Sequence, residues 1–191
     1  MKRDQKLLLA CKLSLFLLLA LTGTALDASH EMFRVTATGS EFTEIEFDLT
    51  DYEFTTQEHD GITYQRLYHP EAGYIFTEGL PELPILTAML MIPDYGDVSI
   101  EVLGIDKTSQ ESDILLFPSQ GPDLVISEET GFLYDREFYK KDISYPAKLV
   151  DIGSPIIMRD FRAVSIAIFP FSYNPGKREL TIHHNVKVRV S

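Results

Sequence analysis

The sequence predicts an all-β protein, an antiparallel β-sandwich or flattened barrel of about eight to ten short strands. Three observations support this prediction. Apolar and polar residues alternate along much of the chain, as in half-buried strands, whereas helical periodicity is nearly absent. Prolines and glycines interrupt the alternating segments roughly every ten residues. No internal repeat or low-complexity linker divides the 191 residues, so a single domain is expected behind a targeting segment.

Residues 1–25 are predicted to be a signal peptide. Basic residues near the start lead into an apolar run from Leu13 to Leu21, which is too short to cross a bilayer. The small residues Gly23 and Ala25 then indicate cleavage after Ala25. We therefore expect a domain of residues 26–191 that is secreted or lies at the cell surface, with no membrane span after cleavage.

The only cysteine is Cys11, which lies within the predicted signal peptide. The stretch from Leu8 to Cys11 resembles a lipoprotein cleavage site, but the apolar run follows the cysteine, whereas lipidation needs it before. Without Cys11 the mature domain has no disulfide, thiol nucleophile or thiolate ligand. Cleavage also changes the net charge from −12 to −15, because residues 1–25 carry four basic residues and one acid. Such acidity argues against nucleic acid as a partner and favours a basic protein.

The first two strands are predicted from alternation within residues 31–38 and 44–50. The second segment places Glu44, Glu46 and Asp48 on one side of an edge-like or surface strand. These acids could suggest a calcium site, but no glycine-containing loop curls them around an ion. We expect them instead to form a solvated face that discourages the addition of another strand.

A hairpin and a buried strand are predicted next. Asp60-Gly61 is a typical tight turn, and residues 62–68 form the return strand. Residues 85–92 are apolar on both faces, which predicts a central strand covered on both sides. The methionines of this run could also form a groove for a partner, but core packing is favoured because the run ends in a hairpin. Residues 98–102 are expected to pair with it as a hairpin.

The middle of the chain has fewer strand signals. Residues 107–113 are polar and are predicted to form a loop, and residues 114–117 a short strand that ends at Pro118. Residues 119–139 show little periodicity. A connection of this length within a small domain is usually functional or disordered.

A C-terminal hairpin is predicted within residues 159–190. Val164, Ile166 and Ile168 would share the buried face of its first strand. The residues expected on the buried face of its second strand are Leu180, Ile182, Val186, Val188 and Val190. Pro175-Gly176 predicts a type II turn with Gly176 at positive φ, inside a loop longer than two residues.

No catalytic, cofactor or metal site is predicted in this chain. His183 and His184 are adjacent on a strand and face opposite ways, so they cannot bind one metal ion together in the usual manner. His30, His59 and His69 have no metal-ligand spacing. No serine lies in a nucleophile elbow, and no glycine-rich loop could hold a phosphate.

Four proline-containing motifs occur in order along the second half of the sequence. They are Gly79-Leu-Pro-Glu-Leu-Pro-Ile-Leu, Pro118-Ser-Gln-Gly, Tyr145-Pro and Pro170-Phe-Ser-Tyr-Asn-Pro, the last preceded by Arg159-Asp-Phe-Arg. Together they resemble the propeptide that precedes gingipain-type cysteine peptidases. The resemblance covers roughly residues 79–190, whereas residues 26–77 contribute strands but no matching motif.

This resemblance implies an amino-terminal prodomain within a longer precursor. Such a prodomain acts as an intramolecular chaperone and as a latency-maintaining inhibitor of the cysteine endopeptidase domain that follows it, and proteolysis removes it. The partner would therefore be the cognate peptidase domain, and the precursor rather than this chain would be the enzyme.

The same resemblance points to the loop after Gly121 as the part that enters the substrate cleft. The candidate inhibitory residues are Asp123, Leu124, Val125 and Ile126. The next basic residue is Arg136, so Leu124 or Val125 would suit an apolar specificity pocket. Cover by shape alone, and packing of the loop on its own core, are the other interpretations.

Two further functions are compatible with the sequence. A non-inhibitory β-sandwich of an exported surface protein could serve adhesion or glycan binding, since fold does not dictate function. Tyr64, Tyr68 and Tyr74 could then form a platform for sugar rings, although the lack of tryptophan counts against this. A hydrolase is disfavoured because no catalytic triad signature is present.

Overall fold

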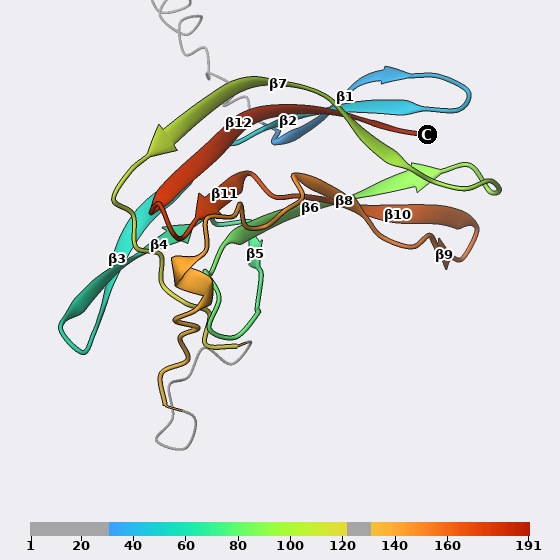
Figure 1. Ribbon diagram of the computed structural model, residues 1–191. Coiled ribbons are helices and arrows are strands. Elements are labelled where there is room, and N and C mark those ends of the chain that lie inside the picture. The colour runs from blue at the N-terminus through green and yellow to red at the C-terminus, as the bar shows by residue number, and fades with distance from the viewer. Residues whose placement is uncertain (1–30, 122–130) are drawn as a thin grey trace, which may run out of the picture. The chain divides into compact units, whose positions relative to one another are not determined.

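The structure consists of two antiparallel five-stranded sheets and a separate hairpin (Figure 1). It is a computed structural model that describes residues 31–121 and 131–191. The predicted all-β fold is confirmed. The described residues form twelve strands rather than about eight to ten, because β5, β8 and β9 have only two or three residues each.

The upper sheet of Figure 1 has the order β1-β2-β12-β11, and β7 also pairs with β12. Its strands are β1 (Phe33–Thr38), β2 (Thr43–Asp48), β7 (Ile100–Glu111), β11 (Phe171–Asn174) and β12 (Glu179–Val190). The sequence left open an edge-like or a surface strand for β2, and because β2 lies between β1 and β12 the edge position is wrong. Cationic side chains on the neighbouring strands β1 and β12 pair with acids of β2, so a strand this acidic can lie inside the sheet.

The lower sheet has the order β5-β6-β10-β8, and β9 also pairs with β10. Its strands are β5 (Gly73–Tyr74), β6 (Pro84–Ile92), β8 (Val150–Ile152), β9 (Ile156–Met158) and β10 (Phe161–Ile168). The separate hairpin consists of β3 (Glu53–His59) and β4 (Ile62–Tyr68), and a 3₁₀ turn covers Phe138–Lys140. The predicted Asp60-Gly61 turn is confirmed, with φ of 49° and 74° at its two residues.

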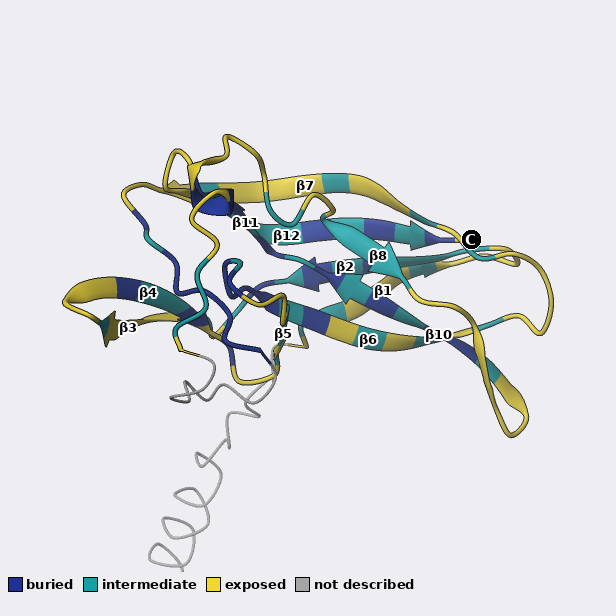
Figure 2. Cartoon of the chain, turned by 60° about the horizontal axis from the view of Figure 1, so that its bottom comes forward, coloured by how far each residue is buried: buried dark blue, intermediate teal, exposed yellow. Residues whose placement is uncertain are grey.

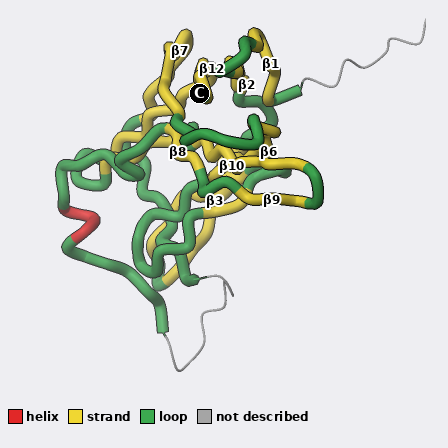
Figure 3. The backbone as a smooth tube through the Cα atoms, turned by 90° about the vertical axis from the view of Figure 1, so that its right-hand side faces the viewer, coloured by secondary structure: helices red, strands yellow, loops and turns green. Residues whose placement is uncertain are grey.

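The core lies between the two sheets, whose layers are seen nearly end-on in Figure 3. Phe47, Val186 and Val188 of the upper sheet and Ile166 and Ile168 of the lower sheet are at most 1% exposed and belong to one apolar cluster. The predicted buried rows on β2, β10 and β12 are therefore confirmed. Figure 2 shows the result as alternating buried and more exposed positions along several strands.

The predicted C-terminal hairpin is wrong in its pairing. β10 pairs with β6, β8 and β9 of the lower sheet, whereas β12 forms a hairpin with the short strand β11 of the upper sheet. The chain changes sheets at Phe169-Pro170. Proline cannot donate a ladder hydrogen bond, and its carbonyl instead accepts one from the His183 N–H at 2.8 Å.

The turn of this hairpin also differs from the prediction. Arg178, with φ of 55°, takes the left-handed conformation that was expected at Gly176. The glycine is needed for a different reason, since a Cβ at Gly176 would lie 2.8 Å from the Lys141 carbonyl oxygen. Its amide donates a 2.9 Å hydrogen bond to that same oxygen.

The pairing predicted for residues 85–102 is wrong as well. β6 is covered on one face only, because Met89 and Met91 are 54% and 69% exposed on the other.

The chain then crosses to the upper sheet, where residues 107–111 belong to β7 instead of a loop. Their polar side chains fit there because β7 is largely exposed along its length. Residues 114–117 make only an isolated bridge at Leu116 rather than a strand.

Within residues 31–121 and 131–191, no helix is long and apolar enough to cross a membrane. The same residues contain no group of three acidic, histidine or cysteine side chains that could hold a metal ion.

Candidate functional site

Gln120 joins the two ends of the segment that the sequence singles out. Its side-chain Nε2 donates to the carbonyl oxygens of Pro118 at 2.9 Å and Leu133 at 3.0 Å, and its Oε1 accepts from the Leu133 N–H at 2.9 Å. Gln120 is only 8% exposed, so these bonds are largely shielded from water. We call residues 117–121 and 131–135 the loop base, because the chain leaves it at Gly121 and returns at Gly131.

A glycine-dependent contact supports one side of the loop base. The Gly79 N–H donates to the Ser119 carbonyl at 2.8 Å, and the Ser119 N–H donates to the Leu80 carbonyl at 2.8 Å. Gly79 has φ of 74°, and a Cβ there would lie 3.0 Å from the Asp135 amide nitrogen. Any other residue at Gly79 would therefore strain the backbone and push residues 134 and 135 away from residue 79.

Aromatic rings hold the returning strand of the loop base. The Phe132 ring stacks on His59 of β3, with 3.8 Å between centroids, and lies 5.7 Å from the rings of Tyr64 and Phe117. Tyr64 and Phe117 are 3% and 5% exposed, so they form a firm surface under Phe132. The loop base is thus fixed to the β3–β4 hairpin by packing as well as by hydrogen bonds.

An ion pair with a buried carboxylate packs against the ring of Phe117. Arg66 of β4 donates to Glu82 Oε1 from Nε at 3.1 Å and from Nη2 at 2.5 Å, and Glu82 is 3% exposed. The Arg66 guanidinium also lies 5.1 Å from the centroid of the Phe117 ring. The Glu82 amide completes the contact by donating to the Phe117 carbonyl at 2.9 Å.

The residues after the loop base form a capped turn beside it. Asp135 Oδ1 accepts from the amides of Glu137 at 3.0 Å and Phe138 at 2.9 Å, which starts the 3₁₀ turn. Burial raises the pKa of Tyr139 far above its ordinary value, so its hydroxyl remains a donor, to the Leu116 carbonyl at 2.9 Å. Both segments that flank the loop base are therefore fixed to the domain.

A hollow of about 990 Å³ opens next to the loop base. Aromatic side chains line part of it, and three basic residues, Arg136, Lys140 and Arg178, line another part. Arg136, the first basic residue after the predicted inhibitory loop, is exposed there. Asp60 also lines the hollow, and Lys140 Nζ lies 2.7 Å from Glu137, so apolar rings and charges of both signs surround the loop base.

The four predicted inhibitory residues, Asp123 to Ile126, lie outside the described residues, as does the predicted cleavage point after Ala25. The structure does place the sequence motifs. Pro81 of the first motif bridges Pro118 of the second, and Tyr145 of the third exchanges two backbone hydrogen bonds with Tyr173 of the fourth, at 2.9 and 2.7 Å. The motifs thus meet in two pairs, one at the loop base and one at β11.

The other candidate sites of the sequence have structural explanations. His184 Nε2 lies 2.7 Å from Ser109 Oγ, and burial lowers the pKa of both His183 and His184. Tyr64 is buried and Tyr74 donates to the Leu67 carbonyl at 3.2 Å, so of the three tyrosines only Tyr68 is exposed. They do not form an open platform for a sugar ring.

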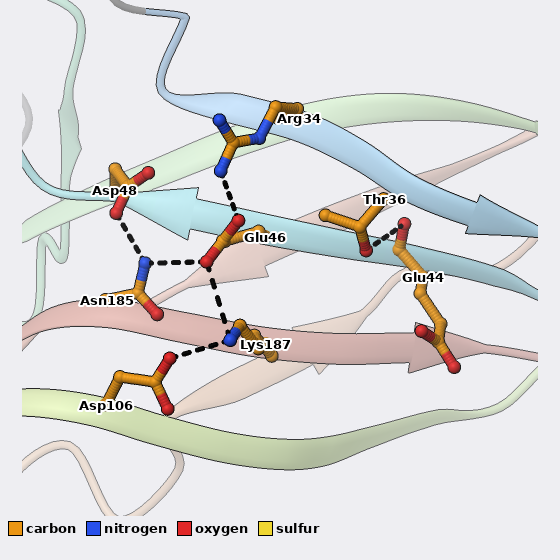
Figure 4. A network of polar contacts seen from close by, with 8 residues as sticks. All are labelled: Arg34, Thr36, Glu44, Glu46, Asp48, Asp106, Asn185 and Lys187. Carbon is orange, nitrogen blue, oxygen red and sulfur yellow. Dashed lines mark hydrogen bonds and ion pairs between the residues drawn. The ribbon is translucent and has the colours of Figure 1, made fainter.

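The acids of β2 lie on the outer face of the upper sheet, as predicted, in a network with cations (Figure 4). Arg34 donates to Glu46, and Lys187 Nζ lies 3.6 Å from Glu46 and 2.7 Å from Asp106. Asn185 Nδ2 bridges Glu46 Oε1 at 3.2 Å and Asp48 Oδ1 at 2.5 Å. The hydrogen bonds from Arg34 and Asn185 lower the pKa of Glu46. The charges satisfy one another, which leaves no set of free carboxylates for calcium.

Comparison with known proteins decides the family. A family model described as Propeptide_C25 matches residues 30–191. The chain belongs to the gingipain propeptide family. The resemblance drawn from the four ordered motifs is therefore confirmed, and the match extends over the N-terminal strands in which no motif was found.

Two gingipains of Porphyromonas gingivalis illustrate the relationship. The propeptide chain is 24% identical to Gingipain R1 over 172 residues, which is 88% of the chain and 17% of that protein. It is 26% identical to Gingipain R2 over 163 residues, which is 83% of the chain and 22% of that protein. The chain spans about a fifth of the length of these relatives.

Two solved structures share the fold. A complex of the Porphyromonas gingivalis RgpB pro- and mature domains matches with a TM-score of 0.74 and 26% identity, over 84% of this chain and 83% of the matched one. A structure on the zymogenic latency of gingipain K matches with a TM-score of 0.70 and 22% identity, over 87% and 94% of the two chains. The second match shows the fold alone.

Proposed function

We propose that this chain is the prodomain of a secreted gingipain-type cysteine endopeptidase, which it helps to fold and keeps latent until proteolysis removes it. The observation that carries the proposal is the loop base of a gingipain propeptide, in which Gln120 ties Pro118 to Leu133. An inhibitor that blocks a cleft must hold both ends of its blocking segment in place before binding, because ordering them afterwards would reduce the affinity.

The comparisons support the partner in this proposal. The RgpB structure contains a pro- and a mature domain in complex, and Gingipain R1 and R2 are several times longer than this chain. We propose by analogy that a cysteine peptidase domain follows residues 26–191 in the same precursor, and that residues 1–25 direct export and are removed after Ala25.

Within this proposal, Asp123, Leu124, Val125 and Ile126 enter the substrate cleft of the peptidase. They lie in the connection whose two ends the loop base holds. Leu124 or Val125 would occupy the specificity pocket, since no basic residue is available before Arg136. A peptidase that prefers apolar residues at its cleavage site is the matching partner.

Inhibition in trans tests this function. Purified domain (residues 26–191) is mixed with the mature peptidase from its own precursor, and hydrolysis of a peptide substrate is followed. We expect inhibition that weakens by at least about tenfold when Leu124 and Val125 are both replaced by glutamate, because two charges would enter an apolar pocket. Absence of inhibition by the unaltered domain at micromolar excess would overturn the proposal.

Gln120→Ala tests the role of the loop base in the same assay. This variant removes all three side-chain hydrogen bonds, so inhibition should weaken even though no residue of the proposed inhibitory loop changes. Gln110→Ala is the matched control, since Gln110 is exposed on β7 of the upper sheet. Equal inhibition by the two variants would show that the base does not position the loop.

A further inference from the structure

Part of the outer face of the lower sheet is apolar where a solvated sheet would be polar. The row of β10 that faces away from the core consists of Phe161, Ala163, Ser165 and Ala167. Phe161 is 59% exposed, whereas Ala163 is covered by its neighbours and only 4% exposed. Met91 of β6 pairs with Ala163, and Met89 pairs with Ser165. Both methionines point to the same side as these small residues, because directly paired positions share a face.

The other flank of β10 continues the apolar surface. Ile156 pairs with Ala163, and Met158 pairs with Phe161. The side chains of Ile156, Met158 and Phe161 are 45%, 55% and 59% exposed. Further along, Gly153 lies beside Ser165 and adds no side chain. The exposed part of this surface is formed by methionine, isoleucine and phenylalanine around the buried Ala163 and the half-buried Ser165. We call the following residues the apolar strip: Met89, Met91, Ile156, Met158, Phe161, Ala163 and Ser165.

The seven residues of the apolar strip are uncharged, and charge on this face lies further along, where Asp151 of β8 pairs with Ala167 and is 3.1 Å from Lys148 Nζ. The nearest arginine in the sheet, Arg162, belongs to the opposite face and donates to the carbonyls of Pro93 at 2.9 Å and Gly96 at 2.7 Å. The upper sheet, by contrast, covers its outer face with ion pairs (Figure 4). A contiguous exposed apolar surface of this kind usually marks a binding site, and methionine adapts easily to the shape of a partner.

We infer that the apolar strip is a docking surface for the peptidase domain of the same precursor. This inference rests on the proposed function. A prodomain needs a face that packs on the enzyme in addition to the loop that enters its cleft. The RgpB match, at 26% identity, is a complex of a pro- and a mature domain, which favours the peptidase over a second copy of this chain as the occupant.

The position of the apolar strip agrees with this occupant. In Figure 1 the described ends of the loop base lie below the lower sheet near β5, and β9, which carries part of the apolar strip, lies at the other end of the same sheet. The upper sheet, with its charged outer face, lies on the far side. One globular partner could therefore contact the apolar strip and the loop base together, leaving the charged face in water.

The test uses a charge-matched pair of variants. Met89→Lys/Met91→Lys places two lysines on the apolar strip, whereas Gln110→Lys/Thr108→Lys places two lysines on exposed positions of β7 in the upper sheet. Both changes alter the net charge equally and involve solvent-exposed strand positions. Thermal unfolding of the domain should be similar for both, which excludes misfolding as the cause of any binding defect.

Binding is measured by calorimetry against the mature peptidase whose active site has first been blocked by a covalent inhibitor. With the cleft occupied, binding of the unaltered domain reports contacts outside the cleft. We expect the methionine variant to lose at least about tenfold in affinity and the β7 variant to bind like the unaltered domain. Equal affinity of both variants, or self-association of the domain through the apolar strip, would overturn the inference.

Inhibition of the unblocked peptidase separates this inference from the proposed function. If the unaltered domain binds the blocked enzyme but does not inhibit the free one, latency is disproved while docking through the apolar strip stands. If the unaltered domain inhibits and the methionine variant inhibits equally well, latency stands and the docking surface is disproved.

Discussion

The two outer faces of this sandwich differ in how they meet water. On the upper sheet, Glu46 is surrounded by Arg34, Asn185 and Lys187, and the last of these also reaches Asp106. On the lower sheet, the corresponding positions of β10 are Ala163, Ser165 and Ala167. The inner faces of both sheets are equally apolar, so the core does not explain the difference. Exposed methionine and phenylalanine side chains on an outer sheet face, such as Met89, Met91 and Phe161, indicate a surface that binds a partner.

The same contrast explains where the charge of the chain is placed. The acids of β2 have cations as neighbours, so a strongly acidic sequence still forms a stable central strand there. On the lower face, the one ion pair that involves a described strand residue is Asp151 with Lys148, beyond the apolar strip. Charge on the outer face of the upper sheet favours solubility. The exposed apolar side chains on the lower sheet can be removed from water on binding with little cost in desolvation free energy.

The largest expected effect distinguishes the two rows of one strand. Ile166 lies on the inner row of β10 and is fully buried, so Ile166→Ala should lower the free energy of unfolding by about 2–5 kcal/mol through lost contacts and a cavity. Ser165→Ala, on the outer row beside it, should change the free energy by less than about 0.5 kcal/mol. Urea unfolding of the two variants measures both. Similar losses would show that the outer row contributes to stability and is not free for a partner.

A smaller effect is expected from the charged face. Lys187→Met leaves Asp106 and Glu46 facing each other without their shared cation, so the melting temperature should fall by a few degrees at most. Because the contacts are electrostatic, the loss should shrink at about 0.5 M NaCl. Lys148→Met is the control, since Lys148 has a single exposed partner, Asp151. A loss that is independent of salt, or equal in the control, would argue against a cooperating network.

Much of this contrast could not be predicted from the sequence. Alternation correctly identified the buried rows of β2, β10 and β12, because burial of every second residue depends only on the strand itself. It could not identify strand partners, so β10 was assigned to the wrong sheet. The run of residues 85–92 was interpreted as covered on both faces, since an apolar side chain on a docking surface has the same sequence pattern as one in a core.

The candidate site was located by its motifs rather than by its chemistry. The Pro118-Ser-Gln-Gly motif marked where the loop starts. The function of Gln120 depends on Leu133, thirteen residues later along a stretch without periodicity, and nothing in the local pattern connects the two. Pairing between the motifs, such as Pro81 with Pro118, was likewise a property of the fold and became visible only in three dimensions.

The smallest expected effect concerns His183 and His184, which place one imidazole on each face of β12. Burial lowers the pKa of both, and the neighbouring His184 lowers that of His183 further, as Lys107 does for His184. The folded protein therefore binds protons less readily than the unfolded chain. Stability from the neutral imidazoles is present above the ordinary pKa of about 6.5 and is lost as the pH falls through the lower folded values.

Replacing both histidines by glutamine should thus reduce the fall in melting temperature between about pH 7.5 and pH 5. The carboxylates with lowered pKa values, Glu46 and Asp142, lose their contribution only at more acidic pH, so they do not confound this window. The single variants show which face is responsible. His184 sits against Ser109 and Tyr52 on the inner side, whereas His183 belongs to the outer row. An unchanged pH dependence in the double variant would show that neither imidazole is held neutral by its surroundings.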